Sequence, residues 1–205
     1  MIAFDAATLD AKDHYKFLSG AIIPRPIAFV TTVSEAGILN AAPFSFFNVV
    51  SSNPPIVSLA IQRDGGNMKD TARNVLATGE LVIHLVDEAL TEDMNATAAR
   101  LAPNDNELLR TKLTTTPSVS VKTPAVQEAK IRMEAKLFQH IPIPNEAGEV
   151  VTDLILAKIS YYVFDSTVFD EEKHYIDAAK MAPVARLAGN DYSKLGDIFT
   201  VTRPN

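Results

Sequence analysis

The sequence predicts a mostly β protein, an antiparallel barrel to which a few short helices are added. Long β-prone runs are separated by turn residues, only two or three short stretches have a helical pattern, and strands do not alternate regularly with helices. The chain has 205 residues, of which 47% are hydrophobic and 21% charged. A single domain over residues 1–205 with a substantial core is therefore expected.

The first strands of the predicted barrel lie between residues 22 and 62. β-branched and aromatic runs at 27–33 and 56–61 are bounded by Pro-, Gly- and Asn-containing turns, which is the pattern of strands joined by turns.

The middle and the end of the chain continue this pattern. A capping residue and a closing glycine bound a short helix over 70–79, and a strand follows at 81–86. An Asp followed by Ala, Leu, Met and Glu predicts a second helix over 87–101. The long runs 131–143 and 150–164, separated by a medium loop, predict two antiparallel neighbours.

The composition excludes several classes of chemistry. Cysteine is absent, so disulfides, thiolate metal sites, iron–sulfur clusters and a cysteine nucleophile are excluded, and redox chemistry would need a cofactor. A net charge of −6 and a pI near 5.2 argue against nucleic acid or an anionic membrane as partner, and favour a small molecule.

Targeting and membrane signals are also missing. Residues 1–16 lack the basic segment followed by an apolar segment that is typical of a signal peptide. No run approaches the ~20 apolar residues that are needed to cross a bilayer. We therefore expect a cytoplasmic protein.

The four histidines, at positions 14, 84, 140 and 174, are too scattered to suggest a metal site, and no metal is expected. His84 shares a strand face with Val82 and Val86, which favours a hydrogen-bonded core or barrel-end histidine. Glycine-rich nucleotide fingerprints are absent, so a Rossmann dehydrogenase or a kinase is disfavoured.

One candidate ligand segment is residues 42–48, where Ser45 and Asn48 alternate with aromatic residues. A planar aromatic ligand needs this mixture of apolar walls and short polar groups. The alternative is a buried strand whose Phe residues fill the core, with Ser and Asn capping a turn.

A second candidate is the predicted helix start at Lys69 and Thr71, because free N–H groups, a cation and a hydroxyl together suit a phosphate. The alternative is that Asn67 or Asp70 caps the helix and Lys69 is solvated. A third is Arg25, held between two prolines; it could be a preset ligand for an anion, or an exposed turn residue.

Together these segments resemble the flavin reductase-like family of FMN-binding split-barrel proteins. The resemblance rests on the order and spacing of residues 24–28 (PRPIA), 40–47 (NAAPFSFF), 53–55 (NPP), 69–74 (KDTARN) and 183–192 (PVARLAGNDY). It implies a split β-barrel, a homodimer with FMN at the subunit interface, a ring held by the backbone around residues 44–48, and a phosphate held near residue 69. The flavin contacts that it suggests are Arg25, Phe44, Ser45, Phe46, Phe47, Asn48, Lys69, Thr71, Asn74, Arg186 and Tyr192.

For Arg186 and Tyr192, anchoring of the C-terminal segment on the barrel is the alternative role. Two departures from the family pattern, Ala188 in place of a second glycine and a short tail after Gly196, concern the nicotinamide side of the site.

The activity implied by the resemblance is that of an NAD(P)H-dependent flavin reductase. Hydride would pass from NADH or NADPH to flavin N5 with no catalytic side chain, and reduced flavin could serve a partner monooxygenase. FAD is an alternative cofactor, and the residues do not choose between NADH and NADPH. A flavin-binding storage, sensor or scaffold protein without turnover, and a structural dimer without ligand, are the rival interpretations.

Overall fold

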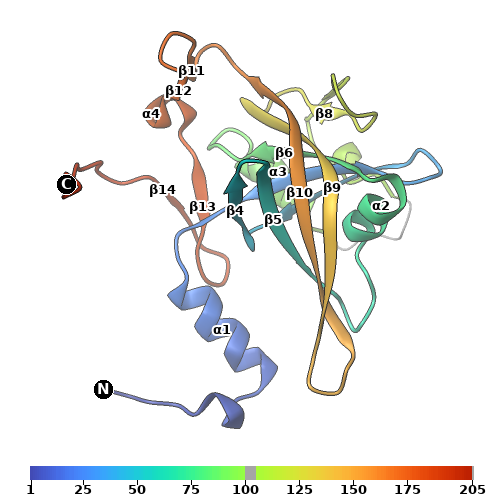
Figure 1. Ribbon diagram of the computed structural model, residues 1–205, viewed down its shortest axis with the longest axis vertical. Helices are drawn as coiled ribbons and strands as arrows, with labels where there is room; N and C mark the ends of the chain where they lie inside the picture. The colour runs from blue at the N-terminus through green and yellow to red at the C-terminus, as the bar shows by residue number, and fades with distance from the viewer. Residues whose placement is uncertain (100–104, 205) are drawn as a thin grey trace.

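The computed structural model describes residues 1–99 and 105–204, and its main feature is a seven-stranded antiparallel sheet (Figure 1). Its two edge strands are consecutive in the chain and are joined only by Ser45 and Phe46, so the sheet has to curl until its edges approach each other. The predicted mostly β, antiparallel fold is confirmed. The spatial order is β3 (Leu39–Phe44), β2 (Ala28–Val33), β6 (Glu80–Leu85), β9 (Ile131–Pro144), β10 (Val150–Phe164), β5 (Pro55–Gln62) and β4 (Phe47–Ser52).

The predicted strands form close to their expected bounds. The long runs become β9 and β10, which pair along almost their whole length around the loop at 145–149. These are also the strands with the clearest β-branched and apolar runs, so local pattern and tertiary pairing agree there.

The helices follow the prediction less closely. Helix α2 (Asp70–Thr78) forms as expected and ends at Gly79, whose φ of 73° is left-handed and favours glycine. The predicted helix over 87–101 is wrong in extent, since α3 spans only Thr91–Ala96 and residues 87–90 form a turn. The Asp87 carboxylate accepts the Leu90 N–H in that turn, while residues 100–101 lie outside the described part.

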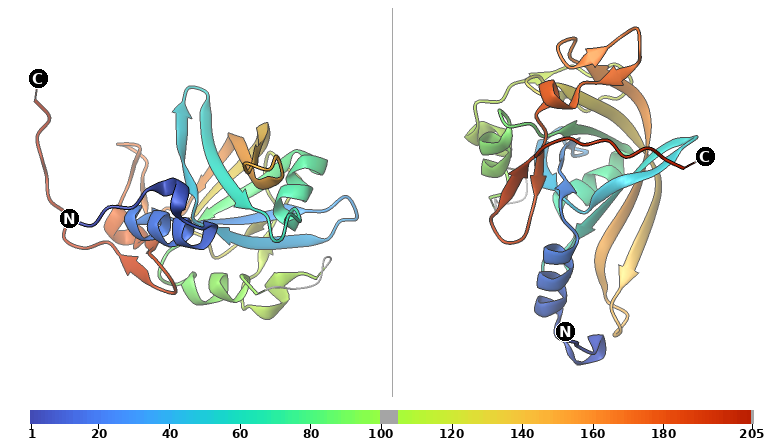
Figure 2. Two further views of the ribbon diagram at one scale, coloured as in Figure 1. Left: turned by 90° about the horizontal axis from the view of Figure 1, so that it is seen from below. Right: turned by 90° about the vertical axis from the view of Figure 1, so that its left-hand side faces the viewer.

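Helix α1 (Ala11–Ala21) was not predicted. Asp10 caps its start by accepting from the Asp13 N–H, yet Ser19 is its one buried residue. The helix lies outside the barrel (Figures 1 and 2). It therefore has no continuous apolar stripe facing a core, which is the signal that identifies most helices in a sequence.

The core occupies both faces of the sheet. Val30, Leu59, Ile83 and Ile155, from four different strands, are fully buried inside the barrel. Alternate residues such as Phe29 point to the opposite face and pack with residues of α3 and the C-terminal hairpin.

Several short pieces complete the fold. The C-terminal hairpin of β13 (Val184–Arg186) and β14 (Tyr192–Lys194) pairs through β13 with β1 (Arg25–Pro26). A hairpin of β11 (Phe169–Asp170) and β12 (Tyr175–Ile176) precedes α4 (Ala178–Met181), and β7 (Thr115–Thr116) pairs with β8 (Ala125–Val126). Short 3-10 turns form at η1 (Ala6–Thr8) and η2 (Glu107–Arg110). Within the described residues, no helix is both long and apolar enough to span a bilayer.

Candidate functional site

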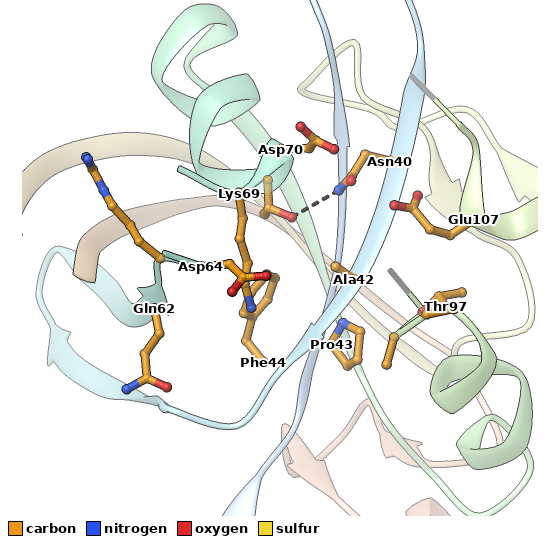
Figure 3. Close-up of a pocket in the computed structure, with 14 residues that line it drawn as sticks. Asn40, Ala42, Pro43, Phe44, Gln62, Asp64, Lys69, Asp70, Thr97 and Glu107 are labelled. Carbon is orange, nitrogen blue, oxygen red and sulfur yellow. Dashed lines mark hydrogen bonds between the residues drawn. The ribbon is translucent and has the colours of Figure 1, made fainter. Parts of the chain in front are cut away.

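Two adjoining pockets lie where β3 ends. The larger, of about 600 Å³, runs from η2 across β3 to the start of α2 (Figure 3). The smaller, of about 180 Å³, lies between α3, the Ser45 turn and the C-terminal hairpin. Both are lined by Pro43, Phe44 and Ala98, so one elongated ligand could occupy both.

The start of α2 forms one wall of the larger pocket. Lys69 occupies the N-cap position but no side chain caps the helix, so the first-turn N–H groups are available to an anion. The alternative in which Asn67 or Asp70 caps this helix is therefore wrong. The Lys69 ammonium lies 6.0 Å from the centre of the Phe44 ring, toward the pocket (Figure 3).

The hydroxyl of Thr71 is fixed by a buried polar network. Asn40 Nδ2 donates to Thr71 Oγ1 at 3.0 Å, and Asn74 Nδ2 donates to Thr32 Oγ1 at 3.1 Å. Thr71 Oγ1 donates to none of the residues that the structure describes, so its proton is available to a ligand. Asn40 lines the pocket, whereas Asn74 lies behind it.

An ion pair with a buried carboxylate supports the part of the pocket wall at residues 62–64. Arg63 donates through Nε and one terminal nitrogen to the two carboxylate oxygens of Asp153, both at 2.9 Å, and His140 Nε2 lies 2.9 Å from the same carboxylate. The pKa of Asp153 is lowered, chiefly by the Arg63 hydrogen bonds. Arg63 lines the larger pocket, and Asp153 balances its charge.

Glu107 supplies a carboxylate on the β3 side of the pocket (Figure 3). Its Oε2 accepts the Ala41 N–H at 3.0 Å, so it covers a free donor of the edge strand β3. Burial raises the pKa of Glu107, although the Ala41 hydrogen bond opposes the shift.

The turn at Ser45 and Phe46 lies between two core residues, Phe44 and Phe47, of which Phe44 also lines both pockets. Phe44 and Phe47 belong to the barrel core, as the structural alternative expected. The Ser45 and Phe46 N–H groups donate to no described residue, and Ser45 lines the smaller pocket. Asn48 is exposed and accepts from the adjacent Val49 N–H.

Arg25 is neither exposed nor in a pocket. It is 7% exposed and donates to the carbonyl oxygens of Ser19, Ile22 and Leu187 at 2.5, 2.5 and 2.8 Å. Its guanidinium carbon also lies 5.9 Å from the centre of the Phe46 ring.

Arg186 and Tyr192 lie side by side on the wall of the smaller pocket. The Arg186 guanidinium carbon is 4.5 Å from the centre of the Tyr192 ring, and the Tyr192 hydroxyl donates to Asn95 Oδ1 at 3.0 Å. The sequence alone could not predict that they share a pocket with Ser45, because this depends on where the C-terminal hairpin packs.

The structure thus gathers six of the eleven predicted residues around the two pockets. Phe44, Lys69 and Thr71 line the larger one, and Phe44, Ser45, Arg186 and Tyr192 the smaller one. Neither pocket is lined by Arg25, Phe46, Phe47, Asn48 or Asn74. Asn40, Arg63 and Glu107 were missed as site residues, although Asn40 lies in a quoted motif. In the described ranges, no group of three or more His, Asp or Glu side chains could hold a metal ion.

His84 behaves as expected of a core histidine. It is fully buried, its Nδ1 lies 2.8 Å from the Phe29 carbonyl oxygen, and its Nε2 accepts the Val126 N–H at 2.8 Å. Both ring nitrogens are satisfied by backbone groups, so it takes no part in the site.

A curled antiparallel sheet with an uncapped helix start, an apolar wall and free N–H groups at its open edge defines a small-molecule-binding β-barrel. The flavin reductase like domain matches residues 19–175. The chain therefore belongs to the flavin reductase-like family, as the sequence motifs indicated, and family membership implies the use of flavin.

Individual proteins are similar to the chain over almost its whole length. The chain is 50% identical over 205 residues to the uncharacterised protein YwrF of Bacillus subtilis, with 100% of both chains covered. It is 40% identical to nitrilotriacetate monooxygenase component B of Bacillus cereus, with a TM-score of 0.95 and 98% of each chain covered. A split-barrel domain structure from Shewanella frigidimarina, 19% identical, has a TM-score of 0.83 and covers 100% of both chains. The predicted split-barrel fold is confirmed.

Proposed function

We propose that the protein is an NAD(P)H-dependent flavin reductase that binds FMN across the two pockets as a single domain. The observation that carries the proposal is the uncapped start of α2, with Lys69 and Thr71 facing a pocket that continues past Phe44 to Ser45. The helix start suits the phosphate, and the free N–H groups of Ser45 and Phe46 suit the polar edge of the ring.

The bound flavin would supply the redox chemistry by accepting hydride from the nicotinamide. The protein's own residues bind and orient the flavin. Lys69 and Thr71 hold the phosphate, while Pro43 and Phe44 form the apolar wall. The backbone of Phe46, Phe47 and Asn48 helps to hold the ring. Asn74 lies behind the pocket and supports its wall by donating a hydrogen bond to Thr32. FAD is the alternative cofactor.

The subunit arrangement that we propose is a homodimer with flavin at the interface. Several large apolar side chains on α1 and β4 are exposed in the single chain, among them Leu18, Val49 and Val50. Exposed apolar surface of this kind is typical of an interface between subunits. The similarity to a monooxygenase component supports a monooxygenase partner, and we propose a cytoplasmic location.

The test is the visible absorption spectrum after mixing with FMN and removing free flavin, followed by anaerobic NADH and then NADPH. Retained bands that bleach would support the reductase. Retained bands that persist with both nucleotides would favour a flavin-binding protein without turnover. If no flavin is retained, turnover of free FMN by added NAD(P)H decides whether flavin is a dissociable substrate.

A further inference from the structure

Arg186 is a cation of the site whose charge no described carboxylate balances, and it shares this property with Lys69 in the larger pocket. It forms no ion pair with any carboxylate in the described ranges, whereas Arg63 is paired with the buried Asp153. Arg186 also lines the pocket that contains Ser45, so its charge lies beside the wall proposed for the flavin ring.

The guanidinium of Arg186 is held in place from two sides. It donates to the Gly189 carbonyl oxygen and lies over the Tyr192 ring, which is tied to α3 through Asn95. Two of its three nitrogens donate to no described residue, so it keeps hydrogen-bonding capacity for a ligand.

Arg25 fixes the strand on which Arg186 lies. The two residues are register partners in β1 and β13, and Arg25 donates to the carbonyl oxygen of Leu187, the residue after Arg186. Its other terminal nitrogen donates to the Ser19 and Ile22 carbonyl oxygens. These lie at the C-terminal end of α1, where the helix dipole favours a positive charge. Of its donors, only Nε is without a partner.

We propose that Arg186 stabilises the negative charge that reduction leaves on the flavin ring, and that Arg25 is a positioning residue for Arg186. The inference rests on the proposed function. A hydride carries two electrons and one proton, so the ring gains one negative charge while the nicotinamide becomes its oxidised cation. A fixed cation in a partly water-excluded pocket stabilises such a charge without reorganising.

The test compares the affinities of oxidised and reduced FMN, and the midpoint potential of bound FMN, in the wild type, Arg186→Ala and Arg186→Lys. Arg186→Ala should weaken reduced FMN about tenfold more than oxidised FMN, which lowers the two-electron potential by about 30 mV. Arg186→Lys should restore most of that difference. Lys173→Ala, an equal charge change in the β11–β12 hairpin away from both pockets, should leave the potential unchanged.

The outcomes separate this inference from the proposed function. If the wild type binds FMN but Arg186→Ala weakens both redox forms equally, Arg186 holds the ring without preferring the reduced form, and the inference is overturned. If neither redox form of FMN binds to the wild type, the proposed function itself fails and takes the inference with it.

The positioning role of Arg25 is tested with Arg25→Lys, which keeps a cation at the buried position. Its potential should shift in the same direction as in Arg186→Ala but by less, and adding Arg25→Lys to Arg186→Ala should cause no further shift. A purely structural residue would lower only thermal stability. A lower melting temperature with an unchanged potential would overturn the positioning role.

Discussion

Asn40 Nδ2 donates a 3.0 Å hydrogen bond to Thr71 Oγ1, and this contact ties the edge strand β3 to the start of α2. Because the amide supplies the proton, the hydroxyl proton of Thr71 can point toward the pocket. The larger pocket is thus built from two elements that meet only in the folded barrel.

The first prediction concerns this hydroxyl. Thr71→Ala should weaken FMN binding roughly 10- to 100-fold, because a hydrogen bond to a charged group is worth about 1.5–3 kcal/mol. Riboflavin, which has no phosphate, should bind the variant and the wild type alike. Fluorescence titration measures both, and Thr71→Ser, which keeps the hydroxyl, is the control. Equal losses for FMN and riboflavin would contradict the phosphate assignment.

Lys69 provides a second prediction at the same wall. Lys69→Gln should weaken FMN but not riboflavin, and the loss should shrink as salt is added, because an exposed charge is screened over about 10 Å at 0.1 M. Lys69→Arg, which keeps the charge, is the matched control. The same titrations at low and high salt check it, and a loss independent of salt would argue against a charge interaction.

Asn74 provides a third prediction, since its side chain lies behind the pocket. Asn74→Ala removes the donor to Thr32 and should lower the free energy of unfolding by about 1–3 kcal/mol. Any loss of affinity should be the same for FMN and riboflavin. Urea denaturation measures the first effect. Asn190→Ala is the control, because Asn190 is exposed and its side chain forms no hydrogen bond with a described residue. A selective loss of FMN would instead make Asn74 a phosphate ligand.

Much of this arrangement could be predicted from local sequence pattern. The long strands and α2 have strong periodicity or clear end signals, so β9, β10 and α2 form where expected. Lys69 and Thr71, which line the larger pocket, could be predicted as candidates for the same reason, because helix starts are visible in sequence.

Other features depend on tertiary contacts and could not be predicted in this way. Asn40 and Glu107 reach the pocket only because β3 is an edge strand. Arg63 becomes a wall residue because Asp153, 90 positions away, holds it. Arg25 looked like an anion ligand because two prolines flank it, but its hydrogen bonds go to backbone carbonyl oxygens that no sequence pattern reveals.

The Arg63–Asp153 pair leads to a fourth prediction. Arg63→Ala leaves a fully buried carboxylate with His140 alone and should cost about 3–5 kcal/mol of unfolding free energy at pH 7. The Arg63 hydrogen bonds lower the pKa of Asp153 in the folded state. Their stabilisation is therefore fully present above the ordinary pKa of 3.8 and is lost as pH falls through the lowered value.

The difference in unfolding free energy between Arg63→Ala and the wild type should therefore become smaller as the pH falls below about 4. Denaturant titrations at several pH values measure this difference. Arg63→Lys keeps the charge but not the two-point contact, so its unfolding free energy should lie between those of Arg63→Ala and the wild type. A difference that stays constant from pH 7 to the acid limit would show that the ion pair is not its source.

The last prediction concerns His84, whose buried position makes the barrel sensitive to acid. The Phe29 carbonyl oxygen needs a proton on Nδ1 and the Val126 N–H needs a lone pair on Nε2, so the ring fits its site only when neutral. Burial lowers the pKa of His84 to about 4, from an ordinary value of 6.5. Between those values the unfolded chain binds a proton that the folded chain does not. The stability should therefore fall as the pH drops from 6.5 toward 4, by about 3 kcal/mol in all.

The free energy of unfolding measured across this range, in the wild type and in His84→Gln, tests the assignment. The variant should be less stable at pH 7, because glutamine does not reproduce both ring contacts, but its stability should fall less between pH 6.5 and 4. His14→Gln, in helix α1, should keep the full slope of the wild type. An unchanged slope in His84→Gln would mean that groups other than the His84 imidazole cause the acid sensitivity.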